Sequence, residues 1–427
     1  SGAIPRTGRG GREKMRTPAV LAAGIMLFSC IACSPRINYH LNGGSRVRTG
    51  LENFVRWPAR KYAGKKAVLV TNQSGFDFNL SQNITLLRKR GIKIETVLAP
   101  EHGVYGYMND IDNRLSWYDR SISCKIYNLY RMNRYSLRLL FDRADFVIFD
   151  IQDMGMRCYT YITNLKDIVD ALDGQDCELI VLDRPNPAGF LGVDGAYLEK
   201  RYTTQYVSAY PAPFLYGMTI GEAARYYRRE FRPRVKLRVI SMSGYRRGML
   251  FSDMNLPWIP PSPNLPTYES AIVYTAVVLL EGTNLSLGRG TTKPFEYIGA
   301  PWIDPQTLCN ALNELRLKNF MFKPVYFTPS SSKYAGSRCG GVQIFYTGGT
   351  FSPTEAAYRI ISAIMKAYPY RASWVRFGPY YDIDALAGTD RFRVFIREGR
   401  QWKEYKKAIA PGIKAFRKKR RKALLCY

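Results

Sequence analysis

The chain has 427 residues, which is enough for two or three domains of ordinary size, and 46% of them are hydrophobic, so a sizeable core can form. Lys and Arg outnumber Asp and Glu by 63 to 34, and the net charge of +29 favours anionic partners such as nucleic acid, anionic lipid or acidic cell-wall fragments. The eight cysteines show no zinc-ribbon spacing, and two histidines are too few for a His-rich zinc site, so we expect no metal.

Residues 1–33 have the pattern of an export signal. A short basic region that ends at Met15-Arg16 precedes an apolar stretch over residues 18–32, which is shorter than the roughly 20 residues of a transmembrane helix. The stretch ends in two overlapping lipobox-like segments, and either Cys30 or Cys33 is the expected lipidated residue. We therefore expect an exported protein, periplasmic or anchored to the membrane as a lipoprotein.

Residues 48–246 are predicted to form a Rossmann-like domain. Short apolar runs predict strands over residues 67–71, 92–99, 124–130, 145–150, 179–183 and 236–242, and amphipathic patterns predict helices over 84–90, 161–172 and 221–230. Strands that alternate with helices indicate a parallel sheet covered by helices on both faces. The nearly continuous apolar strands fit such a doubly buried sheet.

Residues 247–427 are predicted to form a smaller mixed α/β or α+β domain. A Pro-rich passage over residues 256–266 can be neither helix nor central strand, so we expect an irregular connection there. Beyond it the pattern predicts helices over 270–280, 305–317 and 354–368, with strands over 325–328 and 341–347. The basic run over 414–422 is expected to be a solvated helix face rather than a nucleic-acid patch.

Polar clusters follow several of the predicted strands. In open parallel sheets ligands bind beyond the carboxyl ends of the strands, so these clusters are expected to converge on one site. The candidates that they supply are Asn72, Gln73, Glu101, His102, Asp150, Gln152, Asp153, Arg184 and Asn186. No GxGxxG follows the first strand, and the loop 282–290 lacks the ending of a phosphate-binding loop, so we expect no nucleotide cofactor.

Glu101 is the strongest candidate for acid chemistry. It follows a predicted strand, between a proline and a His-Gly pair, and a carboxyl in a partly apolar cleft can act as a general acid. The alternative is a Glu that caps a helix or pairs with an arginine. Asp150 and Asp153 are candidates for a second carboxylate or for binding sugar hydroxyls, although Asp150 also suits a structural role, as His102 does.

The segment 281–296 is long, polar and rich in Gly, Thr, Asn and Arg, which is typical of a binding loop. Asn284 is its candidate for a polar contact with substrate. The candidate carboxylate clamps are Arg157, Arg184, Arg289 and Lys293. Among the tyrosines, which offer faces for sugar stacking, we select Tyr159.

A family resemblance joins these segments. TNQSG, PEHGVYG, DIQDMGMRCYTYI, LDRPNP, GMTIGE, LPWIPPSPNLPT, LLEGTNLSLGRGTTKPFEYIGAPWI, CGGVQI and LAGTD resemble, in this order, the motifs of NamZ-type exo-β-N-acetylmuramidases. The resemblance spans roughly residues 50–399. It implies a Rossmann-like domain, a smaller second domain and a cleft between them, with Glu101 as the acid/base residue and Glu281 nearby. Tyr216 and Tyr334 stand where relatives often have histidine.

The implied reaction is hydrolysis of the β-1,4 bond of a non-reducing terminal N-acetylmuramic acid in peptidoglycan fragments. The lactyl carboxylate of that sugar suits a basic protein. Retaining, inverting and substrate-assisted mechanisms remain open, since the first two differ in carboxyl separation, about 5–5.5 Å against about 6.5–9.5 Å. The alternative function is a non-catalytic peptidoglycan- or glycan-binding lipoprotein. Nucleic-acid binding rests on charge alone, no binding motif supports it, and we do not expect it.

Overall fold

A computed structural model describes residues 46–108, 113–203 and 206–427 of the chain. The predicted leader over residues 1–33, with Cys30 and Cys33, lies outside the described residues. The N-terminal half of the chain ends at residue 266, where the Pro-rich connection ends, and the C-terminal half comprises the residues that follow. No helix within the described ranges is long and apolar enough to cross a bilayer.

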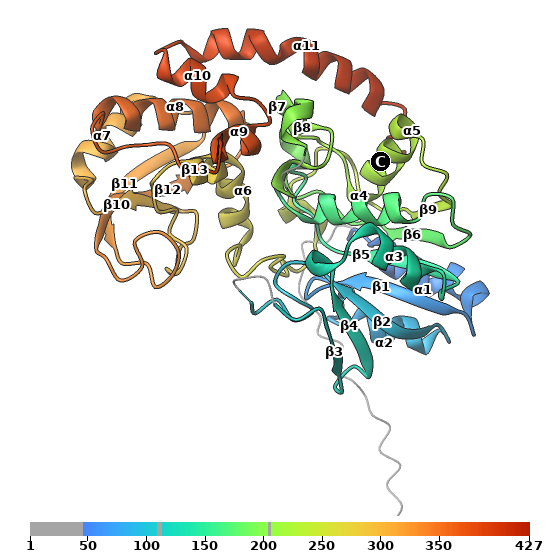
Figure 1. Ribbon diagram of the computed structural model, residues 1–427. Coiled ribbons are helices and arrows are strands. Elements are labelled where there is room, and N and C mark those ends of the chain that lie inside the picture. Colours follow the sequence, from blue (N-terminus) through green and yellow to red (C-terminus); the bar gives the residue numbers. More distant parts are fainter. Residues whose placement is uncertain (1–45, 109–112, 204–205) are drawn as a thin grey trace, which may run out of the picture. The chain divides into compact units, whose positions relative to one another are not determined.

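A seven-stranded sheet organises the N-terminal half (Figure 1). Its strands, in spatial order, are β3 (Ser116–Asp119), β4 (Cys124–Asn128), β2 (Lys93–Ala99), β1 (Lys66–Thr71), β5 (Phe146–Asp150), β6 (Glu178–Leu182) and β9 (Leu237–Ile240). All neighbouring pairs are parallel except β3 with β4. Numbered along the chain, the six parallel strands have the order 3-2-1-4-5-6 of a Rossmann fold, which confirms the prediction.

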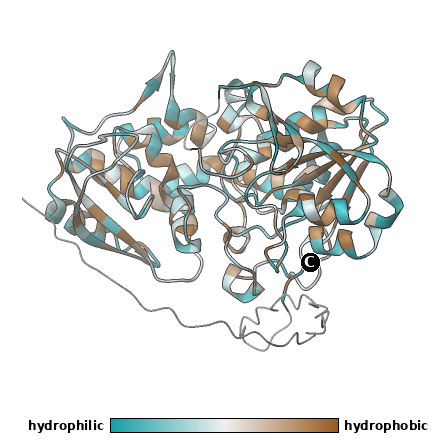
Figure 2. Cartoon of the chain, turned by 90° about the horizontal axis from the view of Figure 1, so that it is seen from below, coloured by the Kyte–Doolittle hydropathy of each residue, from teal (hydrophilic) through white to brown (hydrophobic). Residues whose placement is uncertain are grey.

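Helices cover both faces of this sheet, as the apolar strands predicted. Side chains of β1 alternate between two cores: Ala67 and Leu69 belong to one, and Val68 and Val70 to the other. The first core also takes in α1 (Gly50–Arg56) and α2 (Asn83–Lys89), and the second takes in α3 (Arg134–Phe141), α4 (Tyr161–Ala171) and α5 (Ile220–Phe231). The strands between the helices are correspondingly rich in hydrophobic residues (Figure 2).

Local sequence signals fix where several helices begin. Thr49 with Glu52 forms a capping box at α1, and Thr219 with Glu222 forms another at α5. In each box two backbone N–H groups at the helix start, which lack partners within the helix, find side-chain acceptors. The helix α8 (Pro353–Ala367) begins with a serine cap, Ser352, and a proline at its first position.

The C-terminal half contains a three-stranded antiparallel sheet in the order β10 (Tyr297–Ala300), β12 (Cys339–Tyr346), β11 (Phe320–Phe327). Strand β11 begins five residues before the predicted start at 325 and includes Pro324. A proline cannot donate to a strand ladder, and β11 accommodates it because it is an edge strand. The helices of this half are α6 (Tyr268–Val277), α7 (Pro305–Glu314), α8, α9 (Asp382–Ala387), α10 (Arg391–Arg397) and α11 (Trp402–Arg420).

The Pro-rich connection has neither helix nor strand between residues 256 and 266, as predicted. Its carbonyls bind side chains of the N-terminal half: Pro260 O accepts from Gln73 Nε2 at 3.1 Å, and Pro261 O accepts from Tyr161 Oη at 2.6 Å. The connection is therefore bound to the loop after β1 and to the first residue of α4.

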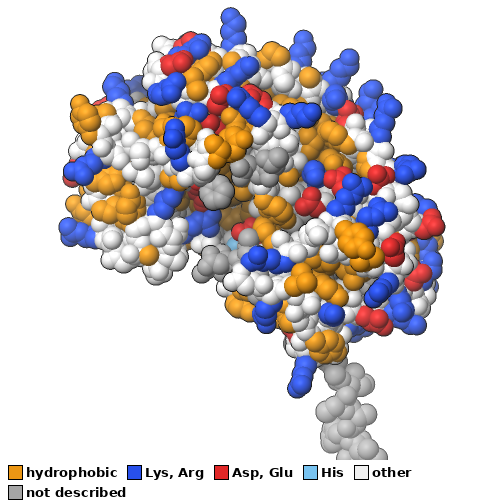
Figure 3. Space-filling view, viewed as in Figure 1, with side chains coloured by type: hydrophobic (Ala, Val, Ile, Leu, Met, Phe, Trp, Pro, Cys, Tyr) orange, Lys and Arg blue, Asp and Glu red, His pale blue; other side chains and the backbone are white. Residues whose placement is uncertain are grey.

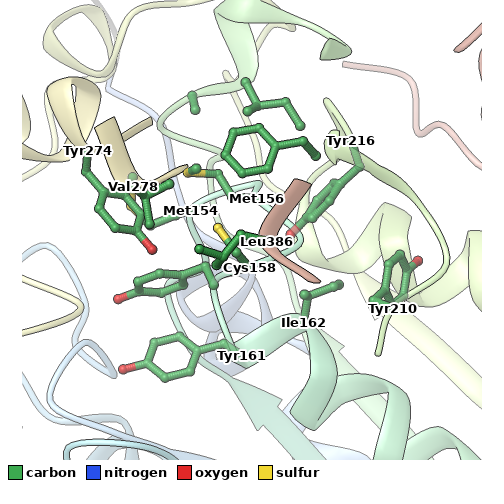
Figure 4. Close-up of a cluster of buried hydrophobic side chains, with 14 of the residues drawn as sticks. Met154, Met156, Cys158, Tyr161, Ile162, Tyr210, Tyr216, Tyr274, Val278 and Leu386 are labelled. Carbon is green, nitrogen blue, oxygen red and sulfur yellow. The ribbon is translucent and has the colours of Figure 1, made fainter. Parts of the chain in front are cut away.

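The two halves share one hydrophobic core. Met154, Met156 and Cys158, which follow β5, lie among Tyr274 and Val278 of the α6 region, Leu386 of α9 and Tyr216 (Figure 4). The halves are thus joined by apolar packing as well as by the connection between them.

Helix α11 lies across both halves (Figure 1). Its Tyr405 stacks on Tyr358 of α8, with ring centroids 5.6 Å apart, while Phe416 meets Tyr226 of α5 at 5.1 Å. Most of the basic run 414–422 is exposed on this helix, as expected of a solvated face, but Arg420 turns inward and donates to the carbonyl of Gly217 at 2.7 Å.

Candidate active site

A pocket of about 680 Å³ opens between the two halves. Figure 3 shows the molecular surface hollowed in this region. The N-terminal half supplies Glu101, Val207 and Asn264, and the C-terminal half supplies Glu281, Leu285, Leu287, Arg289, Ser331, Ser332, Lys333, Asp382, Ala385 and Leu386. The pocket therefore brings together Glu101 and Glu281, which are 180 residues apart in sequence, as the family resemblance implied.

Glu101 is held by the loops that surround it. It lies just beyond the end of β2, and its Oε2 accepts hydrogen bonds of 2.7 Å from Tyr130 Oη and from Thr160 Oγ1. Tyr130 lies in the turn after β4, and Thr160 is the residue before α4. No hydrogen bond from the described residues reaches Oε1, and Glu101 lines the pocket.

Glu281 lies at the end of a short 3₁₀ segment, Val278–Gly282, that continues α6. Arg289 donates to Glu281 Oε1 twice, from Nε at 2.9 Å and from a terminal nitrogen at 2.6 Å, and its guanidinium also lies 4.8 Å from the ring centre of Phe295. The predicted binding loop thus folds back to fix the Glu281 carboxylate. Its Oε2 has no hydrogen-bond donor among the residues described.

Lys333 and Asp382 also line this pocket, and the sequence did not single them out. Lys333 Nζ donates to the carbonyls of Glu281, at 2.7 Å, and of Thr283. Burial lowers the pKa of Lys333, whereas burial raises that of Asp382, and the acid Glu281 raises the pKa of both. One signal was available: Lys333 lies in the segment that drew attention to Tyr334.

Asp150 and Arg184 form a buried pair at the switch point of the sheet and do not line the pocket. Arg184 donates to both Asp150 oxygens, at 2.7 and 3.1 Å, and Asn83 Nδ2 donates to Oδ2 at 2.8 Å. Asp150 is 0% exposed, which leaves no path to a substrate. These contacts fit the structural role that was the alternative for Asp150. Arg184 is bound to Asp150 and is not available as a clamp for substrate.

The amide candidates after the strands also hold loops together. Gln152 donates to the carbonyls of Asp153 and Pro185, Asn186 donates to the carbonyl of Met218, and Asn72 accepts from Ser74. With Gln73 on Pro260, these amides order the carboxyl edge of the sheet, but none of them lines the pocket. The polar side chains after the strands do lie together, as expected, but their hydrogen bonds are made to neighbouring loops and not into the pocket.

Asp153 is buried beside Tyr216. The Tyr216 hydroxyl and the backbone N–H of Gly155 both donate to Asp153 Oδ2, the latter at 2.6 Å. Burial raises the pKa of Asp153 to about 6, although these hydrogen bonds lower it. The Tyr216 hydroxyl therefore serves as a hydrogen-bond partner of this carboxyl.

Arg157 is a tie between the halves and not a clamp facing the pocket. It is fully buried and donates to the carbonyls of Ala196, Ala212 and Leu386 at 3.1, 2.8 and 2.8 Å. Burial lowers its pKa to about 10. Tyr159 is buried too, with its ring packed against the edge of Tyr161 at 4.8 Å, so its face is not open for stacking on a sugar.

The remaining candidates lie outside the pocket as well. His102 is buried and bonds through Nδ1 to the carbonyl of Met108 at 2.7 Å, which matches the structural alternative. Asn284 bonds to the backbone of Arg371 and Ser373, and Lys293 pairs with Glu296 at 3.0 Å. Of the predicted site, the structure gathers Glu101, Glu281 and Arg289. Among the described residues, no group of three or more His, Cys, Asp and Glu is placed to hold a metal ion.

Comparison with known proteins places the chain in a family. Models of the N-terminal and C-terminal domains of exo-beta-N-acetylmuramidase NamZ match residues 67–269 and 272–427. The chain belongs to the NamZ family. It is 35% identical over 415 residues to the peptidoglycan beta-N-acetylmuramidase NamZ of Bacillus subtilis (strain 168), covering 96% of this chain and 99% of that protein. The family is one of glycoside hydrolases.

Two solved structures share the fold. Both are DUF1343 family proteins from Bacteroides fragilis, with 29% and 27% sequence identity and TM-scores of 0.79 and 0.67. Each match covers 89% of this chain and 99% of the other. The NamZ architecture predicted from the motifs is thus confirmed in both halves.

Proposed function

We propose that this NamZ-family chain is an exo-acting glycoside hydrolase that releases non-reducing terminal β-1,4-linked N-acetylmuramic acid from peptidoglycan fragments. The observation that carries the proposal is the pocket between the halves, whose lining contains both Glu101 and Glu281. Its volume of about 680 Å³ lies within the range of about 300–1,000 Å³ usual for small-molecule sites. The Bacillus subtilis relative, a peptidoglycan beta-N-acetylmuramidase, supports the substrate.

Glu101 is the proposed general acid. Its Oε1 gives a proton to the glycosidic oxygen as the bond from that oxygen to the anomeric carbon breaks, and water supplies the hydroxyl that the anomeric carbon takes up. The proton that this water loses returns to the carboxylate of Glu101, which is then ready for another turnover. Tyr130 and Thr160 fix the carboxyl through Oε2, so the acid is positioned without occupying the oxygen that reacts.

Glu281 is the proposed second carboxylate. Arg289 binds only its Oε1, and Oε2 is left to stabilise positive charge on the sugar ring or to activate water. The pocket also contains Asp382, whose carboxyl makes no ion pair within the described residues, and which is therefore the alternative for this role.

The test is the variant Glu101→Gln, which keeps the shape of the side chain but has no proton to give. We expect kcat for release of N-acetylmuramic acid from a β-1,4-linked MurNAc-GlcNAc disaccharide to fall by about 10²–10⁴-fold, with binding retained. Glu95→Gln is the matched control, because Glu95 is exposed on β2, the strand that precedes Glu101, and should leave turnover unchanged.

Unchanged turnover by Glu101→Gln would remove Glu101 from the mechanism. If the wild-type protein binds muramic-acid saccharides but hydrolyses none, the chain is a glycan-binding protein with the fold of the enzyme.

A further inference from the structure

Among the described residues, two basic side chains line the pocket, Arg289 and Lys333. Arg289 is neutralised by Glu281, with which it forms an ion pair of 2.6 Å. Lys333 forms no ion pair with any described residue, although Asp382 and Glu281 are near enough to affect its pKa. Of the basic residues that the structure describes in this lining, Lys333 is therefore the one without an ion-pair partner.

The ammonium group of Lys333 is anchored but not saturated. Two of its three N–H bonds donate to the carbonyls of Glu281 and Thr283, in the segment that also contains the proposed second carboxylate. These contacts fix the nitrogen at the wall of the pocket, and the third N–H has no acceptor among the described residues. A partly buried cation of this kind is a strong donor to an incoming anion.

The other cations that could take this role are placed elsewhere. Arg157 is enclosed by backbone carbonyls, Arg184 is bound to Asp150, and Lys293 is bound to Glu296. None of the three lines the pocket.

We propose that Lys333 forms a carboxylate subsite in this pocket and binds the lactyl carboxylate of the muramic acid residue. The inference rests on the proposed function, because it assigns a part of that substrate to a part of the same site. It also explains how a pocket with three acids, Glu101, Glu281 and Asp382, can accept an anionic sugar. Burial lowers the pKa of Lys333, so binding a carboxylate would also favour its charged form.

The experiment compares two chromogenic probes, 4-nitrophenyl N-acetyl-β-muramide and its lactyl methyl ester, which differ in charge at one group. We expect wild type to prefer the acid in kcat/KM, and Lys333→Gln to lose that preference by about 10- to 100-fold, the usual effect of one charged hydrogen bond. Gln retains a donor for the two carbonyls, and a thermal melt checks that the variant is folded. Lys323→Gln is the control, since Lys323 is exposed on β11 outside the pocket.

A wild-type acid-to-ester ratio in Lys333→Gln would overturn the inference and leave the proposed function intact. If wild type cleaves neither probe, the proposed function fails. The subsite is then decided by calorimetric titration of free N-acetylmuramic acid and its methyl ester. Weaker binding of the acid alone by Lys333→Gln would support it, and equal binding of the acid by variant and wild type would refute it.

Discussion

Tyr216 and Asp153 form a buried hydrogen-bonded pair whose two side chains differ in how readily they ionise. A histidine at position 216 could exchange protons near neutral pH, whereas a tyrosine donates its hydroxyl hydrogen and remains neutral. Burial raises the pKa of Tyr216 well above its ordinary value, and the negative charge of Asp153 raises it as well. In this chain the carboxyl of Asp153 is therefore the group of the pair that titrates.

Asp153 is expected to make folding stability depend on pH. Its folded pKa of about 6 lies above the ordinary value of 3.8, so between these pH values the native protein binds more protons than the unfolded chain. The free energy of unfolding therefore falls as the pH rises from about 4 to about 6, by about 3 kcal/mol, and is not lowered further by this group at higher pH.

Asp153→Asn should remove this contribution to the pH dependence of the free energy of unfolding. Urea unfolding at pH 4 and pH 7 would measure it. Glu95→Gln, at an exposed carboxyl, should leave it unchanged. A slope in Asp153→Asn equal to that of wild type would show that Asp153 is already ionised at pH 4.

At the scale of elements, α9 is placed by a contact between glycine and arginine. Gly388 ends α9 with a φ of 77°, and a Cβ built on it would lie 2.5 Å from a terminal nitrogen of Arg157. The same nitrogen of Arg157 donates a hydrogen bond of 2.8 Å to the carbonyl of Leu386. At Gly388 the C-terminal half thus comes so close to Arg157 of the N-terminal half that there is no room for a side chain.

Gly388→Ala is therefore expected to destabilise the protein by more than the cost of a left-handed backbone, which is about 1–2 kcal/mol for an L-residue. Gly399→Ala is the matched control: it follows α10 with a φ of 68°, and a Cβ there would meet nothing within 4 Å. Chemical denaturation of both variants measures the difference. Equal losses would mean that Arg157 moves aside at little cost.

At the scale of the whole molecule, Phe416 connects the C-terminal helix α11 to the N-terminal half. Its ring packs on Tyr226 and Tyr197 of the N-terminal half, while Tyr405 on the same helix packs in the C-terminal half. Removing a buried Phe side chain costs about 3–5 kcal/mol. Because the core is shared, we expect Phe416→Ala to lower the melting temperature of both halves together.

Differential scanning calorimetry should show one transition that shifts as a unit, and Lys414→Ala, at an exposed site on the same helix, should leave it in place. Two separated transitions in Phe416→Ala would show that each half is stable without the other.

Much of this architecture could be predicted because buried parallel strands leave a plain record in the sequence. The run 145–150 is apolar on both faces, and Glu101 follows a strand directly, so both were found. Lys333 was missed because an isolated lysine in a loop has no periodicity, and Arg157 was misassigned because burial of an arginine depends on carbonyls far away in sequence. Helix α11 was not delimited because Pro411 interrupts its pattern, and burial of Ile409 and Phe416 on either side offsets that break.

The position of α11 has a consequence for how the chain reaches its native state. Tyr197 and Tyr226 meet their partner Phe416 on a helix encoded about 200 residues later, so both rings lack this partner during synthesis until that helix emerges. Contacts at such sequence separation slow folding and expose partly folded chains to aggregation. We therefore expect a newly made chain to be prone to aggregation until this helix has packed.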